Sequence, residues 1–587
     1  MNATLSKTST DVTETIDGNL FLRGLASRYR GVTPISFDTW DRLDLTYQFR
    51  ENEKSPDHST AIRWNENIKL AAEEIFSNVE NITNLSFSEV NDGGDINFWL
   101  YSENDNTLGY SYGIGGTGVF INSFNIENNE IPSGGMDHLT IAHEIMHNLG
   151  LTHPFDGYAK FPGVTSIYDF GELSSNQNIF TVTAYNDTAT KTTDSFFINP
   201  SSNAQLNEFG LSNIGMIDQA FLQTLYGSNE NTNKDDTQFN FNIDDRSQSW
   251  ETIWDTSGID TIKFYGDRSY SVNIDLRAPT LDLTNPNQTL SGICTVIDEN
   301  NWGGFIIGHD VNIENAVSGD GDDILTGNDL DNFLNSENGD NTFRPGSGKD
   351  LIESGNGQDT IYLNSNNLWT DNFVAVHTIT ASASTNETIN LDGFIRFSDH
   401  IFSGGGNDKI YLTSGNDAYF LDDRYSGSNP LSPQASFDLG SPFGIIPRVI
   451  NCEEIYGLEG ADILDFTSSR ITASKLYLDG GAGNDTLWSG VKNDILVGGL
   501  GDDILNAGPG NDQVTGGVGE DHFKFSGLFG NDEIVDWEIG VDKISLYNIA
   551  NNEITFNQNV LLYGENNSIT FTDLSSEEVL SISIEFI

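Results

Sequence analysis

Three histidines and one glutamate stand close together in the segment HEIMHNLGLTH, which runs from His143 to His153. Residues four apart on a helix lie on one face, so His143 and His147 can direct imidazole nitrogens at one ion. Gly150 can adopt the left-handed conformation that ends a helix, and the turn would bring His153 to the same ion. Three neutral histidines that leave an open position are typical of a catalytic zinc site. Glu144 is the candidate base that takes a proton from water at this site.

The spacing of the histidines and the glycine decides between a zinc site and a solvated helix without a metal. An HExxH pair alone also occurs on solvated helices that end at a glycine. The complete HExxHxxGxxH spacing is the extended motif of the metzincins and favours zinc. Asp137 is the expected N-cap of the helix, and Ile141, Ile145 and Leu149 give the helix an apolar side.

Charge and cysteine content narrow the class of protein. The 587 residues predict two or more domains. With 87 acidic and 27 basic residues the formal charge is −60, which disfavours nucleic acid and anionic membranes as partners. Cys294 and Cys452 are too few for a disulfide framework, and the sequence leaves open whether they pair. No apolar run approaches the ~20 residues of a membrane helix, and the first 17 residues lack a signal-peptide core.

The chain up to about residue 235 has the pattern of a mixed α and β domain. Alternating or helical apolar spacing predicts strands at 43–49, 85–90 and 96–100 and helices at 61–79 and 216–226. The polar segment 229–236 is the expected domain boundary.

Most of the remaining chain repeats with a period of nine residues. Five units run from Ser318 to Tyr362 and five from Gly480 to Lys524, with a weaker pair from Ser403 and a fragment near Gly460. The eighth position is apolar, and the sixth is asparagine at Asn332 and Asn341. The sixth position is otherwise an aspartate: Asp323, Asp350, Asp359, Asp408, Asp417, Asp485, Asp494, Asp503, Asp512 and Asp521.

This repeat predicts a calcium-built solenoid. Glycines permit a tight turn with inward carbonyls, and the aspartate adds a carboxylate, which together make an oxygen site for several structural calcium ions. The apolar residue faces the core of a parallel β-roll in which two nonapeptides form one turn. Without the ion the aspartates repel each other, so calcium binding is expected to be coupled to folding. A flexible glycine-rich linker would not keep an aspartate and an aliphatic residue at fixed positions.

These motifs together resemble the serralysins, secreted zinc endopeptidases of the metzincin clan that carry a repeats-in-toxin (RTX) β-roll. The resemblance includes HEIMHNLGLTHP, LDLTYQF, DQAFLQTLYG, ETIWDTSGIDTI and DEIVDWEIGVDKISL. It implies an α+β metzincin-type zinc peptidase domain followed by an all-β parallel β-roll domain. The corresponding ranges are 1–20 for a propeptide, 21–235 for the peptidase and 236–587 for the roll, with insertions near 364–400 and 424–451.

The resemblance also implies roles for individual residues. The zinc ligands would be His143, His147 and His153, with Glu144 as general base. The family has a methionine turn followed by a tyrosine that reaches the zinc, and TVTAY matches it here. Tyr185 is therefore the candidate fifth ligand and transition-state donor, although a core or surface tyrosine is the simpler alternative. Thr183 replaces the methionine, which predicts a shifted or weakened site.

The expected function is that of a secreted, extracellular zinc endopeptidase that cleaves polypeptides and is stabilised by calcium. By resemblance it would leave the cell through type I secretion machinery, guided by an uncleaved C-terminal signal that matches EEVLSISIEFI. A protein inhibitor is a further candidate partner, and the chain is expected to be a monomer without an integral membrane segment. The alternative is a calcium-binding RTX surface or adhesion protein whose peptidase domain has degenerated.

Overall fold

The structure is a computed structural model, and its described residues fall into two compact units. Residues up to 267 together with 272–313 form the first unit, and 268–271 together with 314–587 form the second. The described residues are 15–16, 19–26, 39–57, 61–105, 107–116, 118–124, 131–156, 160–167, 169, 175–177, 179–185, 190–191, 198–199, 211–242, 249–265, 269–279, 281, 292–297, 303–364, 372–380, 383–390, 393–397, 399–421, 448–467 and 473–587.

The first unit is built around a five-stranded sheet in the order β2-β1-β3-β5-β4. All of its neighbouring strands are parallel except β4, which runs antiparallel to β5. The elements of this unit are α2 Leu20–Leu25, β1 Asp44–Arg50, α3 Glu66–Ile82, β2 Ser86–Glu89, β3 Ile96–Tyr101, β4 Gly109–Ser111, β5 Val119–Asn122, α4 Met136–Asn148, β6 Thr190–Lys191, β7 Ile198–Asn199, α5 Met216–Tyr226, β8 Gln238–Asn242, β9 Trp250–Ile253, β10 Thr261–Tyr265, β11 Val272–Asp275, β12 Ile293–Val296 and β13 Gly304–Ile307.

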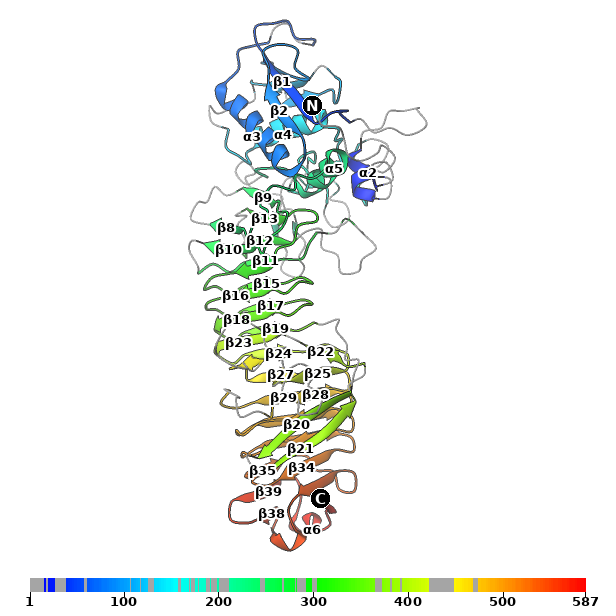
Figure 1. Ribbon diagram of the computed structural model, residues 1–587. Helices are drawn as coiled ribbons and strands as arrows, with labels where there is room; N and C mark the ends of the chain where they lie inside the picture. The colour runs from blue at the N-terminus through cyan, green and yellow to red at the C-terminus, as the bar shows by residue number, and fades with distance from the viewer. Residues whose placement is uncertain are drawn as a thin grey trace. The chain divides into compact units, whose positions relative to one another are not determined.

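Helix α3 lies against one face of this sheet (Figure 1), and aromatic side chains pack between them. Phe76 of α3 lies 4.7 Å from Tyr47 and 5.8 Å from Phe98, measured between ring centroids. Trp64, just before α3, packs on Phe49 at 4.9 Å. The strands and helices predicted in this region are all present, and α5 has the predicted bounds. The first predicted helix begins later, at Glu66, because the side chain of Asn65 caps it by accepting from an amide of its first turn.

The second unit consists of stacked short strands. Its elements are β14 Asn315–Val317, β15 Ile324–Thr326, β16 Phe333–Asn335, β17 Thr342–Arg344, β18 Leu351–Asn356, β19 Thr360–Tyr362, β20 Asn372–Thr380, β21 Ala383–Asn390, β22 Ile395–Arg396, β23 His400–Gly405, β24 Lys409–Tyr411, β25 Asp417–Phe420, β26 Val449–Ile450, β27 Glu454–Tyr456, β28 Ile463–Asp465, β29 Tyr477–Ala482, β30 Thr486–Trp488, β31 Ile495–Leu500, β32 Ile504–Asn506, β33 Gln513–Val518, β34 His522–Ser526, β35 Asn531–Ile534, β36 Lys543–Tyr547, η2 Asn551–Glu553, β37 Ile554–Asn557, β38 Val560–Tyr563, β39 Asn567–Phe571, α6 Ser576–Val579 and β40 Ile584–Phe586.

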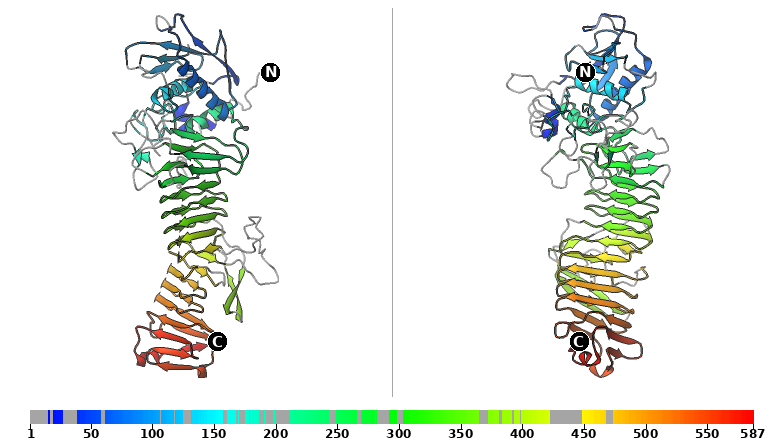
Figure 2. Two further views of the ribbon diagram at one scale, coloured as in Figure 1. Left: turned by 90° about the vertical axis from the view of Figure 1, so that its left-hand side faces the viewer. Right: turned by 180° about the vertical axis from the view of Figure 1, so that it is seen from behind.

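Parallel pairing with an offset of two nonapeptides confirms the β-roll (Figure 2). Leu487 pairs with Leu505 and Leu496 with Val514, each 18 residues apart, and these eighth-position side chains are buried. One series of parallel strands runs β15-β17-β19-β24-β27-β29-β31-β33-β35-β39, and another runs β22-β25-β28-β30-β32-β34-β36-β40. The turns need glycine: Gly499 has φ +114°, and a side chain there would begin 2.0 Å from the carbonyl oxygen of Gly481.

The structure tests some of the predictions made from the sequence only in part. The polar segment 229–236 separates α5 from β8, but the first compact unit continues to Ile313, and the boundary at 235 stays a prediction. The propeptide range and the insertion near 424–451 lie largely outside the described residues, whereas the insertion near 364–400 contains the antiparallel strand pair β20 and β21. Cys294 and Cys452 are both buried and form no disulfide. None of the helices in the described part of the chain is long and apolar enough to cross a membrane.

Candidate metal centre

Helix α4 carries the first two candidate ligands. It spans Met136–Asn148 with Gly135 as N-cap, so the prediction that Asp137 caps this helix was wrong. Asp137 lies instead in the first turn, where a negative charge stabilises the helix N-terminus through the helix dipole. Gly150 follows with φ +106°, the conformation that its place after the helix predicted.

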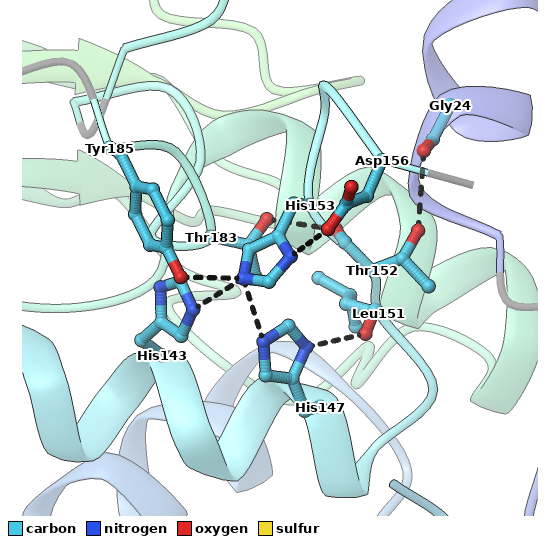
Figure 3. A network of polar contacts seen from close by, with 9 residues as sticks. All are labelled: Gly24, His143, His147, Leu151, Thr152, His153, Asp156, Thr183 and Tyr185. Carbon is cyan, nitrogen blue, oxygen red and sulfur yellow. Dashed lines mark hydrogen bonds and ion pairs between the residues drawn. The ribbon is translucent and has the colours of Figure 1, made fainter. Parts of the chain in front are cut away.

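The three histidines converge through their Nε2 atoms (Figure 3). The Nε2 of His153 lies 3.0 Å from that of His143 and 3.3 Å from that of His147. Two ligands of a tetrahedral zinc, each bound at about 2.0–2.1 Å, are about 3.3 Å apart. The three side chains also form a group whose ligand atoms all lie within 4.8 Å of one another. The donor set and its spacing therefore fit a zinc ion.

The Nδ1 atom of each histidine has a fixed acceptor. Nδ1 of His143 is 2.9 Å from the carbonyl oxygen of Val182, and Nδ1 of His147 is 2.8 Å from that of Leu151. Nδ1 of His153 lies 2.9 Å from a carboxylate oxygen of Asp156. Donation from Nδ1–H leaves the lone pair of each Nε2 directed at the common point, which is the usual arrangement around a protein metal.

Burial keeps these imidazoles neutral, as metal ligation requires. Burial lowers the pKa of His147 to about 4, and it also lowers the pKa values of His143 and His153. The neighbouring imidazoles add to the effect for His143, because two positive charges so close together repel.

Glu144 is buried next to the histidine trio. Its Oε2 has no hydrogen-bond partner, and burial raises the pKa of its carboxyl to about 8. Its side chain faces strand β4, since a Cβ atom on Gly109 would lie 3.1 Å from the Cγ of Glu144. A buried carboxyl without a protein partner beside three ligand nitrogens is suited to proton transfer.

Tyr185 brings its hydroxyl to the same group of nitrogen atoms (Figure 3). Its hydroxyl lies 3.1 Å from Nε2 of His153, and its ring stacks on His143 at 5.4 Å. The structure therefore brings the three histidines and Tyr185 together, and Glu144 follows His143 on the same helix. The side chain of Tyr185 is 55% exposed, so its hydroxyl lies where a substrate can reach it.

The turn that carries Thr183 is held by hydroxyl groups. Thr183 is fully buried and donates to the carbonyl oxygen of Thr152 at 3.1 Å. Its oxygen is also 2.9 Å from the hydroxyl of Thr181, which donates to Asp218 of α5. Asp218 further accepts the amide of Val182 at 2.7 Å. The hydroxyl of Thr183 is thus paired, and the three Nε2 atoms still converge.

The sixth-position residues of the roll form ladders. The amide of Asp494 donates to Oδ1 of Asp512, and the amide of Asp512 donates to Oδ1 of Asp532, at 2.8 and 3.0 Å. The Oδ2 atoms of these residues are buried and have no hydrogen-bond partner, and burial raises the pKa of Asp512 to about 9. Buried carboxylate oxygens left over in glycine turns fit a hard cation such as calcium.

Every predicted calcium aspartate lies in such a ladder. Besides Asp494 and Asp512, these are Asp323, Asp350, Asp359, Asp408, Asp417, Asp485, Asp503 and Asp521. Two of them also use the second carboxylate oxygen within the protein: Asp323 accepts the amide of Gly319, and Asp417 accepts both the amide and the hydroxyl of Thr413. Sequence reasoning missed the further rungs Asp399, Asp462, Asp532 and Asp542. Asp462 could have been found, since it is the sixth residue of the unit GLEGADILD.

The comparisons with known proteins agree with both halves of this description. A family model described as the RTX calcium-binding nonapeptide repeat (4 copies) matches residues 317–352, 337–367, 396–421, 477–494 and 488–523. The chain is 28% identical to "Serralysin" of Photorhabdus luminescens over 310 residues, 49% of this chain and 58% of that protein. It is 30% identical to "Serralysin" of Proteus mirabilis over 305 residues, 48% of this chain and 55% of that protein. It is 26% identical to "Metallopeptidase AprA" of Pseudomonas marginalis over 322 residues, covering 50% and 61%. The chain thus spans less than two thirds of the length of these relatives.

Proposed function

We propose that this serralysin-like chain with RTX repeats is a secreted zinc endopeptidase whose roll is folded by calcium. One observation carries the proposal: three Nε2 atoms converge beside the unpaired buried carboxyl of Glu144. The proposal assigns residues 21–235 to a metzincin-type peptidase domain and residues 236–587 to the calcium-binding roll.

The residues of the site have distinct roles in this proposal. His143, His147 and His153 would hold the zinc, which when bound would polarise the substrate carbonyl and lower the pKa of the attacking water. Glu144 would take the proton of that water and return it to the leaving amine. Its Oε2 has no hydrogen-bond partner in the protein and is therefore available to accept that proton. Tyr185 would donate its hydroxyl hydrogen to the developing oxyanion.

Calcium would make folding of the roll depend on whether the protein is inside or outside the cell. At low intracellular calcium the ladder carboxylates repel, which would keep the roll unfolded for type I export. Millimolar extracellular calcium would neutralise them. The ladders of buried Oδ2 atoms support this role for the ion.

The decisive experiment is digestion of casein by the full chain after loading with zinc and calcium. We expect cleavage by the wild type, its loss in Glu144→Ala, and one zinc with several calcium ions by elemental analysis. If wild type and Glu144→Ala are equally inert although fully loaded, the protein is not a general endopeptidase.

The second candidate function is a calcium-binding surface or adhesion protein with a degenerate peptidase domain. Thr183 at the methionine position favours it, because it departs from the family pattern at the floor of the site. In that case the chain would bind calcium and fold, yet take up no zinc in competition with a weak chelator.

A further inference from the structure

A row of flat side chains crosses the five-stranded sheet on the face opposite α3. Strand pairing places Arg50 of β1 beside Trp99 of β3. It also places Trp99 beside Phe120 of β5, and Phe120 beside Tyr110 of β4. The guanidinium of Arg50 lies 5.9 Å from the centre of the Trp99 ring. Trp99 and Phe120 stack at 6.2 Å with an interplanar angle of 12°, and Phe120 and Tyr110 stack at 4.6 Å with 4°. The row therefore continues in register as far as β4.

Strand β4 is the last strand of this sheet in the described part of the chain. The amide of Asn122 donates to the carbonyl of Leu108, so by antiparallel alternation the main-chain groups of Gly109 and Ser111 point away from β5. Gly109 also lies against Glu144, as a Cβ there would approach the Cγ of Glu144 to 3.1 Å. An extended polypeptide added along this edge would thus pass the candidate site and place one side chain next in the row, beside Tyr110.

The surroundings of that position carry a negative charge and hydroxyl groups. The hydroxyl of Tyr110 donates to Oδ2 of the exposed Asp57 at 3.2 Å, and Tyr112 lies near the same carboxylate. The ring of Tyr112 stands edge-on to that of Tyr110 at 5.7 Å and is 57% exposed. An aromatic face next to a carboxylate favours a planar cation, which stacks on the ring and pairs with the acid. The same combination occurs at the other end of the row, where Arg50 lies over Trp99 and is 3.5 Å from a carboxylate oxygen of Asp92.

We propose that Asp57, Tyr110 and Tyr112 form a subsite for an arginine side chain of the polypeptide substrate. This inference rests on the proposed peptidase function. The substrate would then be a polypeptide that carries arginine at one fixed position relative to the cleaved bond. A guanidinium stacks on the ring plane with its charge spread over that plane, whereas a lysine ammonium is a point charge, so arginine is preferred over lysine.

The test begins with digestion of a peptide library by the zinc- and calcium-loaded protein, with cleavage sites read by mass spectrometry. We expect arginine to be enriched at a single position relative to the cleaved bond. Two fluorogenic peptides are then compared that carry arginine or its neutral planar analogue citrulline at that position. We expect kcat/KM to be about tenfold higher for arginine, from a cation stacked on a ring and paired with one carboxylate.

Variants show whether this preference comes from the subsite. Asp57→Asn should bring the arginine-to-citrulline ratio close to one. Glu66→Gln removes the same charge from an exposed side chain at the start of α3 and should leave the ratio unchanged. No arginine enrichment, or an equal ratio in wild type and Asp57→Asn, would overturn the subsite while leaving the peptidase intact.

A binding measurement separates this failure from failure of the enzyme. The Glu144→Ala protein should bind the arginine peptide more tightly than the citrulline peptide in fluorescence anisotropy, and Asp57→Asn added to it should remove the difference. Absence of cleavage with this difference present would refute the peptidase and keep the subsite. Absence of both would refute the two together.

Discussion

The amide of Asp485 donates a hydrogen bond to Oδ1 of Asp503, its equivalent one turn of the roll later, at 2.7 Å. Asp503 donates in the same way to Asp521 at 2.9 Å. The Oδ2 atoms of Asp485 and Asp503 remain buried and unpaired, and a side chain on Gly498 would begin 2.3 Å from Oδ2 of Asp503. Asp485 and Asp503 therefore each use one carboxylate oxygen for the backbone and leave the other buried at a glycine turn. The folded roll needs a cation or a proton at each of these oxygens.

The calcium-free roll is expected to be more stable in acid than at pH 8. Burial raises the pKa of Asp503 to about 7 and that of Asp512 to about 9, whereas an aspartate in the unfolded chain has a pKa of about 3.9. The folded state therefore binds more protons, and its stability falls as the pH rises from about 4 through these folded-state values. The urea midpoint of the chelator-treated protein, followed by circular dichroism, should be higher at pH 5 than at pH 8.

Calcium should reverse this dependence of stability on pH, because the ion competes with the protons for the same oxygens. With calcium in excess, the midpoint should be higher at pH 8 than at pH 5. Equal midpoints at both pH values in the presence of chelator would contradict the ladder interpretation.

Asn341→Asp should add a calcium requirement to the first set of repeats. The side-chain amide of Asn341 donates to the carbonyls of Gly339 and Ser354 at 3.0 and 3.2 Å, so this turn satisfies its own oxygens. An aspartate would remove these donors and add a buried charge, which costs about 1–3 kcal/mol of folding free energy without an ion. Calorimetric titration should find one more calcium than in the wild type. A variant with unchanged calcium content and stability would argue against the role of the amide.

The sequence could predict those parts of the fold and site that depend on local spacing. His143, His147 and His153 lie within eleven residues on one helix and its C-terminal turn, and the ladder aspartates recur at a fixed period. Asp218 could not be predicted, because it holds the turn at Val182 only through packing of α5, 36 residues away. Asp399 was not predicted for another reason. Its unit FIRFSDHIF has the sixth-position aspartate but none of the turn glycines.

Asp156→Ala should weaken zinc binding without destabilising the fold. Asp156 is the one carboxylate among the acceptors of the three Nδ1 atoms, and its side chain is 62% exposed. Loss of such an acceptor typically costs about 10- to 100-fold in metal affinity. Competition with a chromophoric chelator measures the change, and the unfolding midpoint of the zinc-free protein should not move. Asp156→Asn keeps an acceptor oxygen and should retain most of the affinity.

Thr183→Met, which restores the family residue, should weaken the site here. Thr183 is fully buried and hydrogen-bonds to Thr152 and Thr181, so a methionine would overfill the space and leave the Thr152 carbonyl without this donor. Overpacking of this kind costs about 1–3 kcal/mol. The melting temperature and the zinc affinity should both fall. Thr183→Val, which keeps the volume and removes only the hydroxyl, separates the two causes, and a gain of stability in Thr183→Met would refute the packing argument.

Tyr185→Phe should lower kcat with little change in KM or zinc content. The hydroxyl of Tyr185 lies 3.1 Å from Nε2 of His153, while the ring packs on His143 and Phe155, so phenylalanine keeps the ring contacts and loses only the donor. Burial raises the pKa of Tyr185, with the charge of Glu144 adding to the effect, so the phenol stays protonated and able to donate at neutral pH. Loss of one oxyanion donor costs about 10²- to 10³-fold in kcat. A change in KM alone would assign Tyr185 to substrate binding in the ground state, because only an interaction made in the transition state lowers kcat and kcat/KM equally.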